Sequence, residues 1–514
     1  MNLLKNSKPQ HTGNYWCTWR TQTTVSKNKT LQKINTDSNR DCMGEEFLFG
    51  EVGVLHTIDP EIRGDLIVVL DDGWDIPYGL NNISFRNRDA NYFKFGSLIL
   101  DETRFPSFTG TPQEKLKKLG DTVKGMGYKG IGLWVAVQVA NPECKIFSAE
   151  EAEPYWKERM LWCKEADIQY LKLDWGANDH DKDYRVMLNR LAKLYSPSTK
   201  IEHAYTQWVF DKRVAEHADE DYQNRLEEIG FYQLHCDYFR VYDATAEFRN
   251  VTLMSRAMEC FKAARGKEKE SNSIPNVEDG VYIGAALGCS IGAMRNYTFE
   301  SNPAFHYTKK LETPMTALKR ALIWQRLAPP FAISESPFEI SENYVTDAYC
   351  YPYIEGNPWP YVSEKYVAQD CFTAMSRNMP LPEVKAEYNE KPPVVCSIHP
   401  LTKALSVYAA PRTTGGSIFY SILADVSVQG GESRYPVGIF GKYKSLTITF
   451  TDDITDKKIF AQDLCTIEAQ DITEKVAVCG NRLTISGELI ETVGLTVRQC
   501  KTELPGLIVS ILDE

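Results

Sequence analysis

Short apolar runs along residues 14–340 are separated by longer stretches in which apolar residues recur every three or four positions. The short runs predict buried strands, and the amphipathic stretches, such as residues 111–127 and 152–167, predict helices. This alternation is typical of a parallel sheet covered by helices. A (β/α)8 TIM barrel, an α/β fold, is therefore predicted. Its strands are expected within residues 14–20, 65–74, 130–138, 168–176, 199–205, 238–244, 281–296 and 329–336.

The pattern changes near residue 380. Residues 381–392 contain proline and charged residues without periodicity, which predicts a linker. Residues 393–514 contain short runs rich in β-branched and aromatic residues, separated by residues that favour turns. This spacing is typical of an antiparallel β-sandwich. We therefore predict a catalytic barrel over residues 1–380 and an accessory C-terminal β-sandwich over residues 393–514.

The fourth predicted strand, IQYLKLDWG at residues 168–176, carries two opposite charges on one face. Alternate residues of a strand point to the same side, so Lys172 and Asp174 point together, while Leu171 and Leu173 point the other way. A buried ion pair often only breaks even against apolar residues, because both charges must leave water. The pair therefore indicates a functional site, with a structural ion pair as the alternative.

Polar and aromatic residues also end the neighbouring predicted strands. The C-terminal ends of the strands carry the active site in a (β/α)8 barrel. Carboxylates and cations hydrogen-bond sugar hydroxyls, and indole rings cover the apolar side of a sugar ring, so such a mouth favours a small carbohydrate. The residues expected to converge there are Asp71, Asp72, Trp134, Lys172, Asp174, Glu202, Arg240 and Asp243.

Composition excludes several classes of partner. The net charge of -11 and the pI near 5.5 disfavour nucleic acid, because a phosphate backbone is bound by clustered Lys and Arg. Runs of about 18 apolar residues are absent, so no membrane span is expected. The 13 cysteines include no CxxC pair and no Cys/His cluster, which predicts reduced thiols, with no metal and no other cofactor. The first residues lack an apolar signal core, so we expect a cytoplasmic protein, or a periplasmic or secreted one if a signal peptide was removed.

Four motifs in chain order, VVLDDGWDIP, KGIGLWVA, YLKLDWG and FRVYDAT, resemble the retaining α-galactosidase clan of glycoside hydrolase families 27 and 36. The resemblance spans about residues 14–340, and a following β-sandwich is also the arrangement of that clan. It does not separate the two families. It implies an exo-acting hydrolase of terminal α-linked sugars, expected to be α-galactosides. Related enzymes of the clan act on α-N-acetylgalactosaminides, β-L-arabinopyranosides or α-glucans.

The same resemblance implies a role for each residue of the mouth. Asp174 occupies the position of the nucleophile in the K-x-D motif, and Asp243 that of the general acid and base. A retaining glycosidase needs two carboxyl groups about 5 to 5.5 Å apart, one ionised and one protonated. Lys172 would keep Asp174 ionised, whereas Asp243 would need surroundings that hold its proton. The residues expected to bind the substrate are Asp71, Asp72, Trp134, Lys172, Glu202 and Arg240.

Other interpretations stay open. Asp71 and Asp72 precede a glycine and also fit a simple turn, and Asp237 and Glu247 are nearby alternatives to Asp243. One competing function is a barrel enzyme that binds a divalent cation, for which Asp71, Asp174 and Glu202 at successive strand ends would be the ligands. Another is a sugar-binding protein without catalysis. The oligomeric state cannot be predicted from these patterns.

Overall fold

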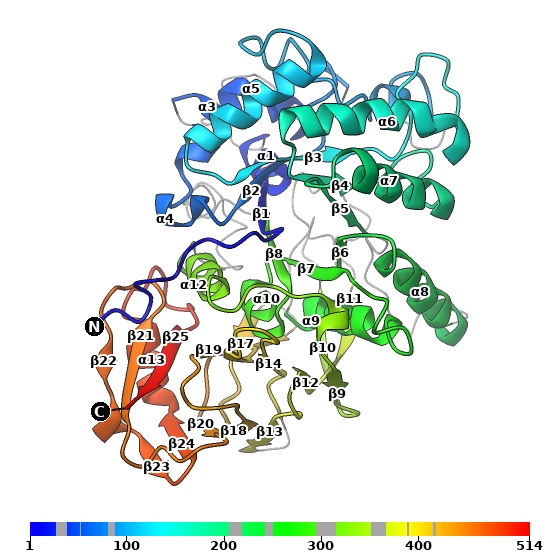
Figure 1. Ribbon diagram of the computed structural model, residues 1–514. Helices are drawn as coiled ribbons and strands as arrows, with labels where there is room; N and C mark the ends of the chain where they lie inside the picture. Colours follow the sequence, from blue (N-terminus) through cyan, green and yellow to red (C-terminus); the bar gives the residue numbers. More distant parts are fainter. Residues whose placement is uncertain are drawn as a thin grey trace.

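The computed structural model describes residues 1–26, 39–51, 53–80, 88–204, 218–241, 250–294, 315–350, 366–387, 390–414 and 418–513. The N-terminal part of the chain forms a closed barrel of eight parallel strands that follow one another in sequence order (Figure 1). The predicted (β/α)8 barrel is thereby confirmed. The strands are β1 (Tyr15–Cys17), β2 (Ile67–Leu70), β3 (Gly130–Val135), β4 (Tyr170–Leu173), β5 (Lys200–His203), β6 (Tyr238–Arg240), β7 (Ile274–Glu278) and β8 (Ser290–Ala293).

Helices cover the outside of the barrel (Figure 1). Both helices singled out in the sequence are present, and each begins with a capping box, Thr111 with Glu114 for α5 and Ser148 with Glu151 for α6. The helices of the barrel region are α1 (Trp19–Ser26), α2 (Asn39–Cys42), α3 (Glu45–Phe49), α4 (Pro60–Arg63), α5 (Pro112–Gly125), α6 (Ala149–Ala166), α7 (Lys182–Tyr195), α8 (Ala218–Gln233), α9 (Asn250–Ala263), α10 (Val281–Leu287) and α12 (Met315–Gln325).

Two of the eight strand predictions require correction. The first six observed strands lie inside the predicted runs, but β7 lies at residues 274–278, where no strand was predicted. Residues 281–287 form α10, and the run from 281 to 296 contributes β8. Residues 329–336 are wrong as a strand, because they contain only the short helix η4 (Ile333–Glu335). The sequence of β7, IPNVE, contains proline and alternating polar residues, so it lacks the apolar run by which the other strands were found.

The C-terminal region contains two packed sheets, with a buried apolar core between them. The predicted sandwich is present, but its sheets are mixed: β12–β14, β15–β19 and β18–β20 pair in parallel. The eight-stranded sheet comprises β9 (Phe338–Ile340), β12 (Ala374–Arg377), β14 (Val394–Ile398), β15 (Leu405–Ala409), β19 (Val437–Gly441), β21 (Lys458–Asp463), β22 (Gln470–Asp471) and β25 (Gly506–Leu512). The five-stranded sheet comprises β13 (Glu383–Ala386), β18 (Ala424–Gln429), β20 (Ser445–Thr449), β23 (Ala477–Cys479) and β24 (Arg482–Ser486).

Strands of this region begin before residue 380. β9 pairs with β12 in the eight-stranded sheet, and β13 pairs with β18 in the five-stranded sheet. β13 therefore lies inside the stretch whose composition predicted a linker. The remaining elements are the hairpins β10 (Tyr344–Cys350) with β11 (Tyr366–Phe372) and β16 (Arg412–Thr414) with β17 (Ile418–Tyr420), and the helix α13 (Gly487–Gly494).

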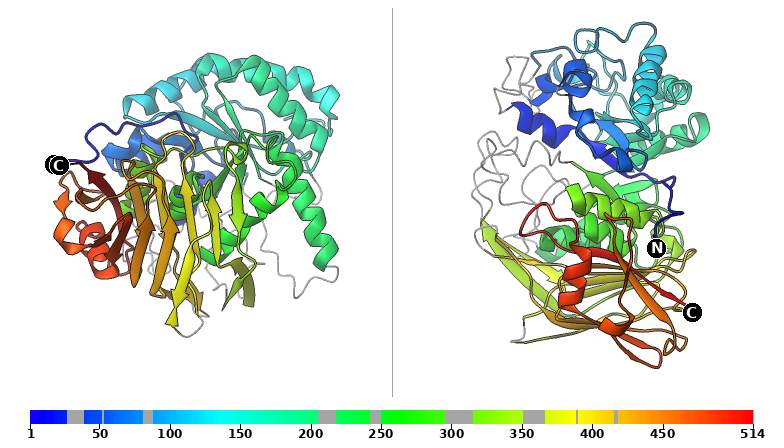
Figure 2. Two further views of the ribbon diagram at one scale, coloured as in Figure 1. Left: turned by 60° about the horizontal axis from the view of Figure 1, so that its bottom comes forward. Right: turned by 90° about the vertical axis from the view of Figure 1, so that its left-hand side faces the viewer.

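The barrel and the eight-stranded sheet share one apolar core, to which α10 and α12 contribute (Figure 2). The indole of Trp324 on α12 donates to Ser406 Oγ of β15 at 2.9 Å, and Arg320 on the same helix pairs with Asp463 at the end of β21. The N-terminal segment also reaches the sheet, since the Met1 carbonyl accepts from the Ala469 N–H. The barrel is thus held against the sheet at several points.

Most of the described cysteines lie in the protein interior. Every cysteine whose side chain is described is a free thiol, and eight of these twelve are buried, as expected for core residues. Over the same described ranges, no helix combines the length and the apolar character needed to span a membrane.

Candidate active site

Asp174 lies directly after β4, at the C-terminal end of the barrel. Its backbone N–H donates to the carbonyl of Val135, which extends the pairing of β4 with β3. The indole N–H of Trp134 donates to Asp174 Oδ2 at 2.8 Å, and the indole of Trp74 donates to the Trp134 carbonyl at 2.9 Å. The Asp174 side chain is 11% exposed. The barrel therefore presents this carboxylate at its mouth and fixes its orientation.

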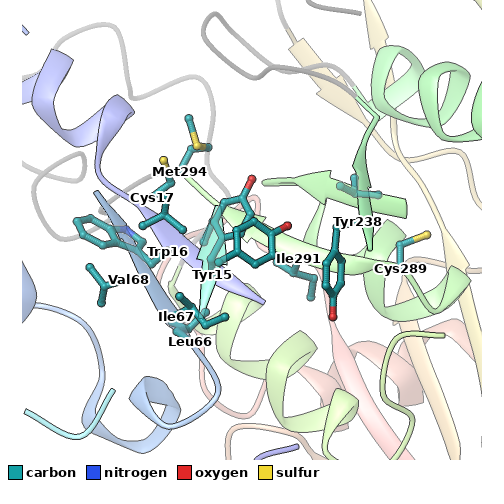
Figure 3. Packing of buried hydrophobic residues seen from close by; sticks show 14 of the residues in the cluster. Tyr15, Trp16, Cys17, Leu66, Ile67, Val68, Tyr238, Cys289, Ile291 and Met294 are labelled. Atoms are coloured by element: carbon teal, nitrogen blue, oxygen red, sulfur yellow. The ribbon is translucent and has the colours of Figure 1, made fainter. Parts of the chain in front are cut away.

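Lys172 lies one step deeper on the same face of β4 and is buried. Its Nζ is 2.9 Å from Asp71 Oδ2 and 3.4 Å from Glu278 Oε1. Two sulfur atoms also lie near Lys172 Nζ, Cys17 Sγ at 3.5 Å and Met294 Sδ at 4.0 Å. Figure 3 shows the side chains of Cys17 and Met294. Burial alone would lower the pKa of Lys172, but Asp71 above all raises it well above its ordinary value. The lysine is therefore a fixed positive charge inside the barrel.

Arg240 on β6 is a second buried cation, and three carboxylates of the described residues lie close to it. Its Nη2 lies 3.7 Å from Asp174 Oδ1, its Nε lies 3.5 Å from Glu202 Oε1, and its Nη1 lies 3.8 Å from Glu278 Oε1. Glu202 and Glu278 belong to β5 and β7, and Asp174 directly follows β4. One guanidinium thus connects three strands of the barrel immediately below the mouth.

Tyrosine hydroxyls complete the lower side of this network. Tyr170 donates to Glu202 Oε2 and Tyr15 donates to Glu278 Oε1, both at 2.8 Å. The two rings pack edge to face with their centroids 5.4 Å apart. Buried polar groups need partners of this kind, because an unsatisfied group carries its full desolvation cost. The tyrosines therefore hold both glutamates in fixed positions.

The network separates the ionisation of its acids. Burial would raise the pKa of Asp174, but Arg240 and then Lys172 outweigh it and hold this pKa below its ordinary value. Burial raises the pKa of Glu202 to about 7, although Arg240 and Lys172 oppose the shift. A pair of acids with such different proton affinities is typical of catalytic sites. At a pH between these two pKa values, Asp174 is ionised while Glu202 still holds its proton.

Asp72 has a different set of partners from its neighbour Asp71. Its two carboxylate oxygens each accept a hydrogen bond from Arg40, from Nε and Nη2, both at 2.8 Å. The Arg40 guanidinium also lies over the rings of Phe95 and Trp175, 5.4 and 5.9 Å from their centroids. The acid pair of the DDGW motif therefore splits, one carboxylate facing the barrel interior and the other facing α2.

The structure brings together most of the residues predicted from the strand ends. Glu202 and Arg240, which were expected to touch the sugar, are completely buried, and their described contacts are with protein groups. Asp243 lies outside the described residues. The network also contains residues that the sequence analysis did not select: Tyr15, Cys17, Arg40, Tyr170, Glu278 and Met294. The sequence signal for Glu278 was an acid followed by Asp-Gly, as at the end of β2, whereas Arg40 had none.

The metal-dependent alternative placed a cation between Asp71, Asp174 and Glu202. In the structure the ammonium group of Lys172 contacts Asp71, and the guanidinium of Arg240 approaches the other two acids. Among the residues that the structure describes, no group of three His, Cys, Asp or Glu side chains is arranged to hold a metal ion. The described acids at this mouth thus have side-chain cations as their neighbours.

Comparison with known proteins gives distant structural similarity to glycoside hydrolases. No family model and no curated protein sequence matches the chain. A family 27 β-L-arabinopyranosidase from Geobacillus stearothermophilus aligns at 9% identity over 99% of this chain and 97% of that chain, with a TM-score of 0.41. A variant of that enzyme, solved in complex with arabinose, aligns at 9% identity over 98% of this chain and 97% of that chain, with a TM-score of 0.39. A maltogenic α-amylase from Thermotoga neapolitana aligns at 11% identity over 99% of both chains, with a TM-score of 0.41.

Proposed function

We propose that this protein is a retaining exo-α-glycosidase that hydrolyses terminal α-linked sugars, with α-galactosides as the expected substrates. The supporting observation is the state of Asp174. Its carboxylate is the most exposed of the acids in the network, its orientation is fixed by Trp134, and two buried cations keep it ionised. These are the properties that a nucleophile needs before it attacks an anomeric carbon.

The proposed reaction has two displacements. In the first, the Asp174 carboxylate forms a bond to the anomeric carbon, and the bond from this carbon to the leaving-group oxygen breaks. A carboxylic acid protonates that oxygen, and Asp243 is the residue proposed for this role. In the second, water attacks the same carbon as Asp243 takes its proton, and Asp174 leaves as a carboxylate. The anomeric configuration is retained.

Arg240 and Lys172 support both displacements in this scheme. They hold Asp174 ionised for attack, and they stabilise the negative charge that returns to it when the covalent intermediate is hydrolysed. Because both cations are buried, water screens them little. We propose that they act through Asp174, as does Glu202 through its contact with Arg240.

Covalent labelling tests this function directly. A galacto-configured cyclitol epoxide reacts with the nucleophile of a retaining enzyme, so mass spectrometry should find one adduct, on the peptide that contains Asp174. We expect Asp174→Ala to lose the adduct and nearly all turnover of nitrophenyl glycosides, and to recover some turnover with azide. Asp183→Asn, which changes an exposed acid of α7, serves as the matched control.

The alternatives give different outcomes in the same experiment. Sugar binding without turnover would support a non-catalytic protein, and loss of activity on chelation would support a cation-dependent enzyme. An adduct on another residue, or a first product of inverted configuration, would refute the role of Asp174. A panel of glycosides then separates α-galactosides from the related substrates.

A further inference from the structure

Arg40 is bound to the mouth of the barrel by an ion pair that no sequence motif indicated. It forms a two-point contact with Asp72, in which Nε and Nη2 each donate to a different carboxylate oxygen at 2.8 Å. The side chains are 13% and 4% exposed, respectively. Such a two-point arginine–carboxylate contact is strong and directional. The pair therefore lies at the edge of solvent with its geometry fixed.

The backbone around Arg40 is built onto the DDGW motif. Gly73 has a φ of 117°, and a Cβ atom there would lie 2.8 Å from the Arg40 carbonyl oxygen and 3.0 Å from its Cα. Only glycine permits this approach. Buried Arg104 also binds this segment, since its Nη1 donates to the same Arg40 carbonyl at 2.6 Å and its Nη2 donates to Asp41 at 3.0 Å. The position of Arg40 is therefore fixed by the same motif that supplies Asp72.

Aromatic contacts connect Arg40 to the proposed nucleophile. The ring of Trp175, over which the guanidinium lies, is 5.1 Å from the ring of Trp134, centroid to centroid. Trp134 bonds to Asp174, and Trp175 follows Asp174 in the chain. Asp72 also lies close enough to Asp174 for the two charges to interact. Arg40 and Asp72 are thus connected to the proposed nucleophile by ring contacts and by charge.

We propose that Arg40 determines specificity at the sugar-binding subsite, where its pair with Asp72 places a hydrogen-bond donor and an acceptor side by side for neighbouring sugar hydroxyls. This inference rests on the proposed function and adds the chemistry of recognition. A carboxylate has about four acceptor positions, and Arg40 occupies two of those on Asp72. A hydroxyl can donate to the carboxylate while its neighbour accepts from the guanidinium. The matching ligand is a neutral sugar with adjacent hydroxyls, and an analogue lacking one of them is rejected.

Arg40 also keeps Asp72 able to accept. Burial raises the pKa of Asp72, Arg40 opposes that shift, and the nearby acids Asp71 and Asp174 reinforce it. Asp75, three residues along the chain, also interacts with Asp72. Without Arg40, Asp72 would take up a proton at a higher pH and change from an acceptor to a donor. The loss of Arg40 should therefore move the acidic limb of the kcat/KM profile to higher pH.

The test measures kcat/KM for an aryl glycoside of the preferred sugar and for its monodeoxy analogues. The ratio of the two values is independent of the folded fraction, because both are measured on one preparation. We expect the wild type to reject at least one analogue by about 100-fold or more, and Arg40→Ala to reduce that ratio by about 10-fold. Asp72→Asn should reduce the ratio at the same hydroxyl position.

Two further variants separate recognition from a purely structural role. Arg40→Lys keeps the charge but loses the two-point contact. The acidic limb of its kcat/KM profile should therefore stay at the wild-type pH, while its ratio of kcat/KM for the preferred sugar to that for the deoxy analogue should fall. Arg434→Ala is the matched control, since Arg434 also pairs with an acid, Glu432, and lies over a ring, Tyr435, in the C-terminal region. It should leave the ratio and the profile unchanged.

The outcomes distinguish this inference from the proposed function. A wild type that is not labelled at Asp174 or does not turn over glycosides overturns both. A labelled, active wild type whose Arg40→Ala and Arg40→Lys variants keep the wild-type ratio for every analogue overturns this inference alone. Reduced thermal stability with an unchanged ratio and an unchanged acidic limb would also overturn it, since that is the signature of a structural role.

Discussion

Two buried arginines, Arg320 and Arg240, are each placed among carboxylates, but the geometry of their contacts differs. Arg320 forms a two-point pair with Asp463, with both N–O distances at 2.8 Å, and contacts Glu503 as well. It joins α12 of the barrel region to the end of β21 in the eight-stranded sheet. Both oxygens of Asp463 are bound by one guanidinium, so this contact fixes one arrangement of the two regions.

Arg240 approaches its three carboxylates at longer distances, between 3.5 and 3.8 Å. One positive charge is thus spread over Asp174, Glu202 and Glu278. Coulomb attraction falls slowly with distance, whereas a hydrogen bond requires close contact. The arginine lowers the pKa of Asp174, and the described distance between Arg240 Nη2 and Asp174 Oδ1 is 3.7 Å.

The comparison teaches that two buried arginines with carboxylate neighbours can serve different purposes. The two-point contact of Arg320 joins the barrel region to the eight-stranded sheet, whereas the longer contacts of Arg240 adjust the pKa of Asp174. Removing each arginine should therefore affect different properties. Stability should depend on Arg320, and the pH dependence of catalysis should depend on Arg240.

The largest effect is expected for Arg320→Met. This change leaves Asp463 and Glu503 buried without their cation, which should lower the free energy of unfolding by about 3–5 kcal/mol. Chemical denaturation followed by fluorescence measures it, and kcat of the folded protein should stay at the wild-type value. Arg434→Met, which removes an exposed pair, should give no measurable change. Equal stability of the Arg320 and Arg434 variants would contradict this structural role of Arg320.

The next effect is expected for Arg240→Met, and it concerns activity. Loss of this preorganised charge should lower kcat/KM by about 100- to 1,000-fold. The pKa of Asp174 should rise, because Arg240 is the strongest of the charges that lower it. In the proposed mechanism Asp174 must be ionised to attack, so activity at acidic pH should be lost first. Arg240→Lys keeps the charge and should largely preserve the acidic limb; an acidic limb that does not move in Arg240→Met would exclude this role.

The strands of the barrel could be predicted wherever apolar residues occupy both faces. β2, with the sequence IVVL, is such a run, and the acids that follow it mark its end. β7 was missed because its inward-facing residues near the mouth, Asn276 and Glu278, are polar. Its outward-facing residues are Pro275 and Val277, which together form too short an apolar signal. Because the residues of β7 that line the mouth are polar, its sequence lacks the apolar pattern by which a buried strand is predicted.

Other parts of the molecule depend on information that local patterns lack. The spacing of Lys172 and Asp174 predicted a shared face, and the structure places both in one network. Depth along the barrel could not be predicted: Glu202 pairs in register with Lys172, one layer below Asp174, and is therefore buried. Arg40 could not be found either, because sequence spacing does not specify which short helix packs over Gly73.

The linker prediction shows the same limit at a sheet edge. β13 alternates exposed and half-buried residues, with Glu383 and Lys385 on one face, and it pairs on one side only, with β18. Charged residues on an edge strand discourage pairing with another chain. A composition of proline and charge is therefore shared by linkers and by edge strands, and only the pairing distinguishes them.

The smallest effect is expected for Glu202→Gln, and it concerns how stability changes with pH. Burial raises the pKa of Glu202 from 4.5 to about 7; Tyr170, Arg240 and Lys172 oppose the shift, and Glu278 reinforces it. Below pH 4.5 the acid is protonated in both the folded and the unfolded chain. Between pH 4.5 and about 7 the unfolded chain releases the proton and the folded chain keeps it, so stability falls as pH rises.

Glutamine cannot titrate, so the variant should lose less stability than the wild type over this interval, by at most about 3 kcal/mol. Denaturation at pH values across the interval measures the difference. The slope should decrease without disappearing, because burial also raises the pKa of Asp75 to about 7. Glu227→Gln, at an exposed position of α8, should keep the wild-type slope. Identical slopes for Glu202→Gln and the wild type would mean that Glu202 is already ionised in the folded protein at acidic pH, and that Arg240 binds it as firmly as Arg320 binds Asp463.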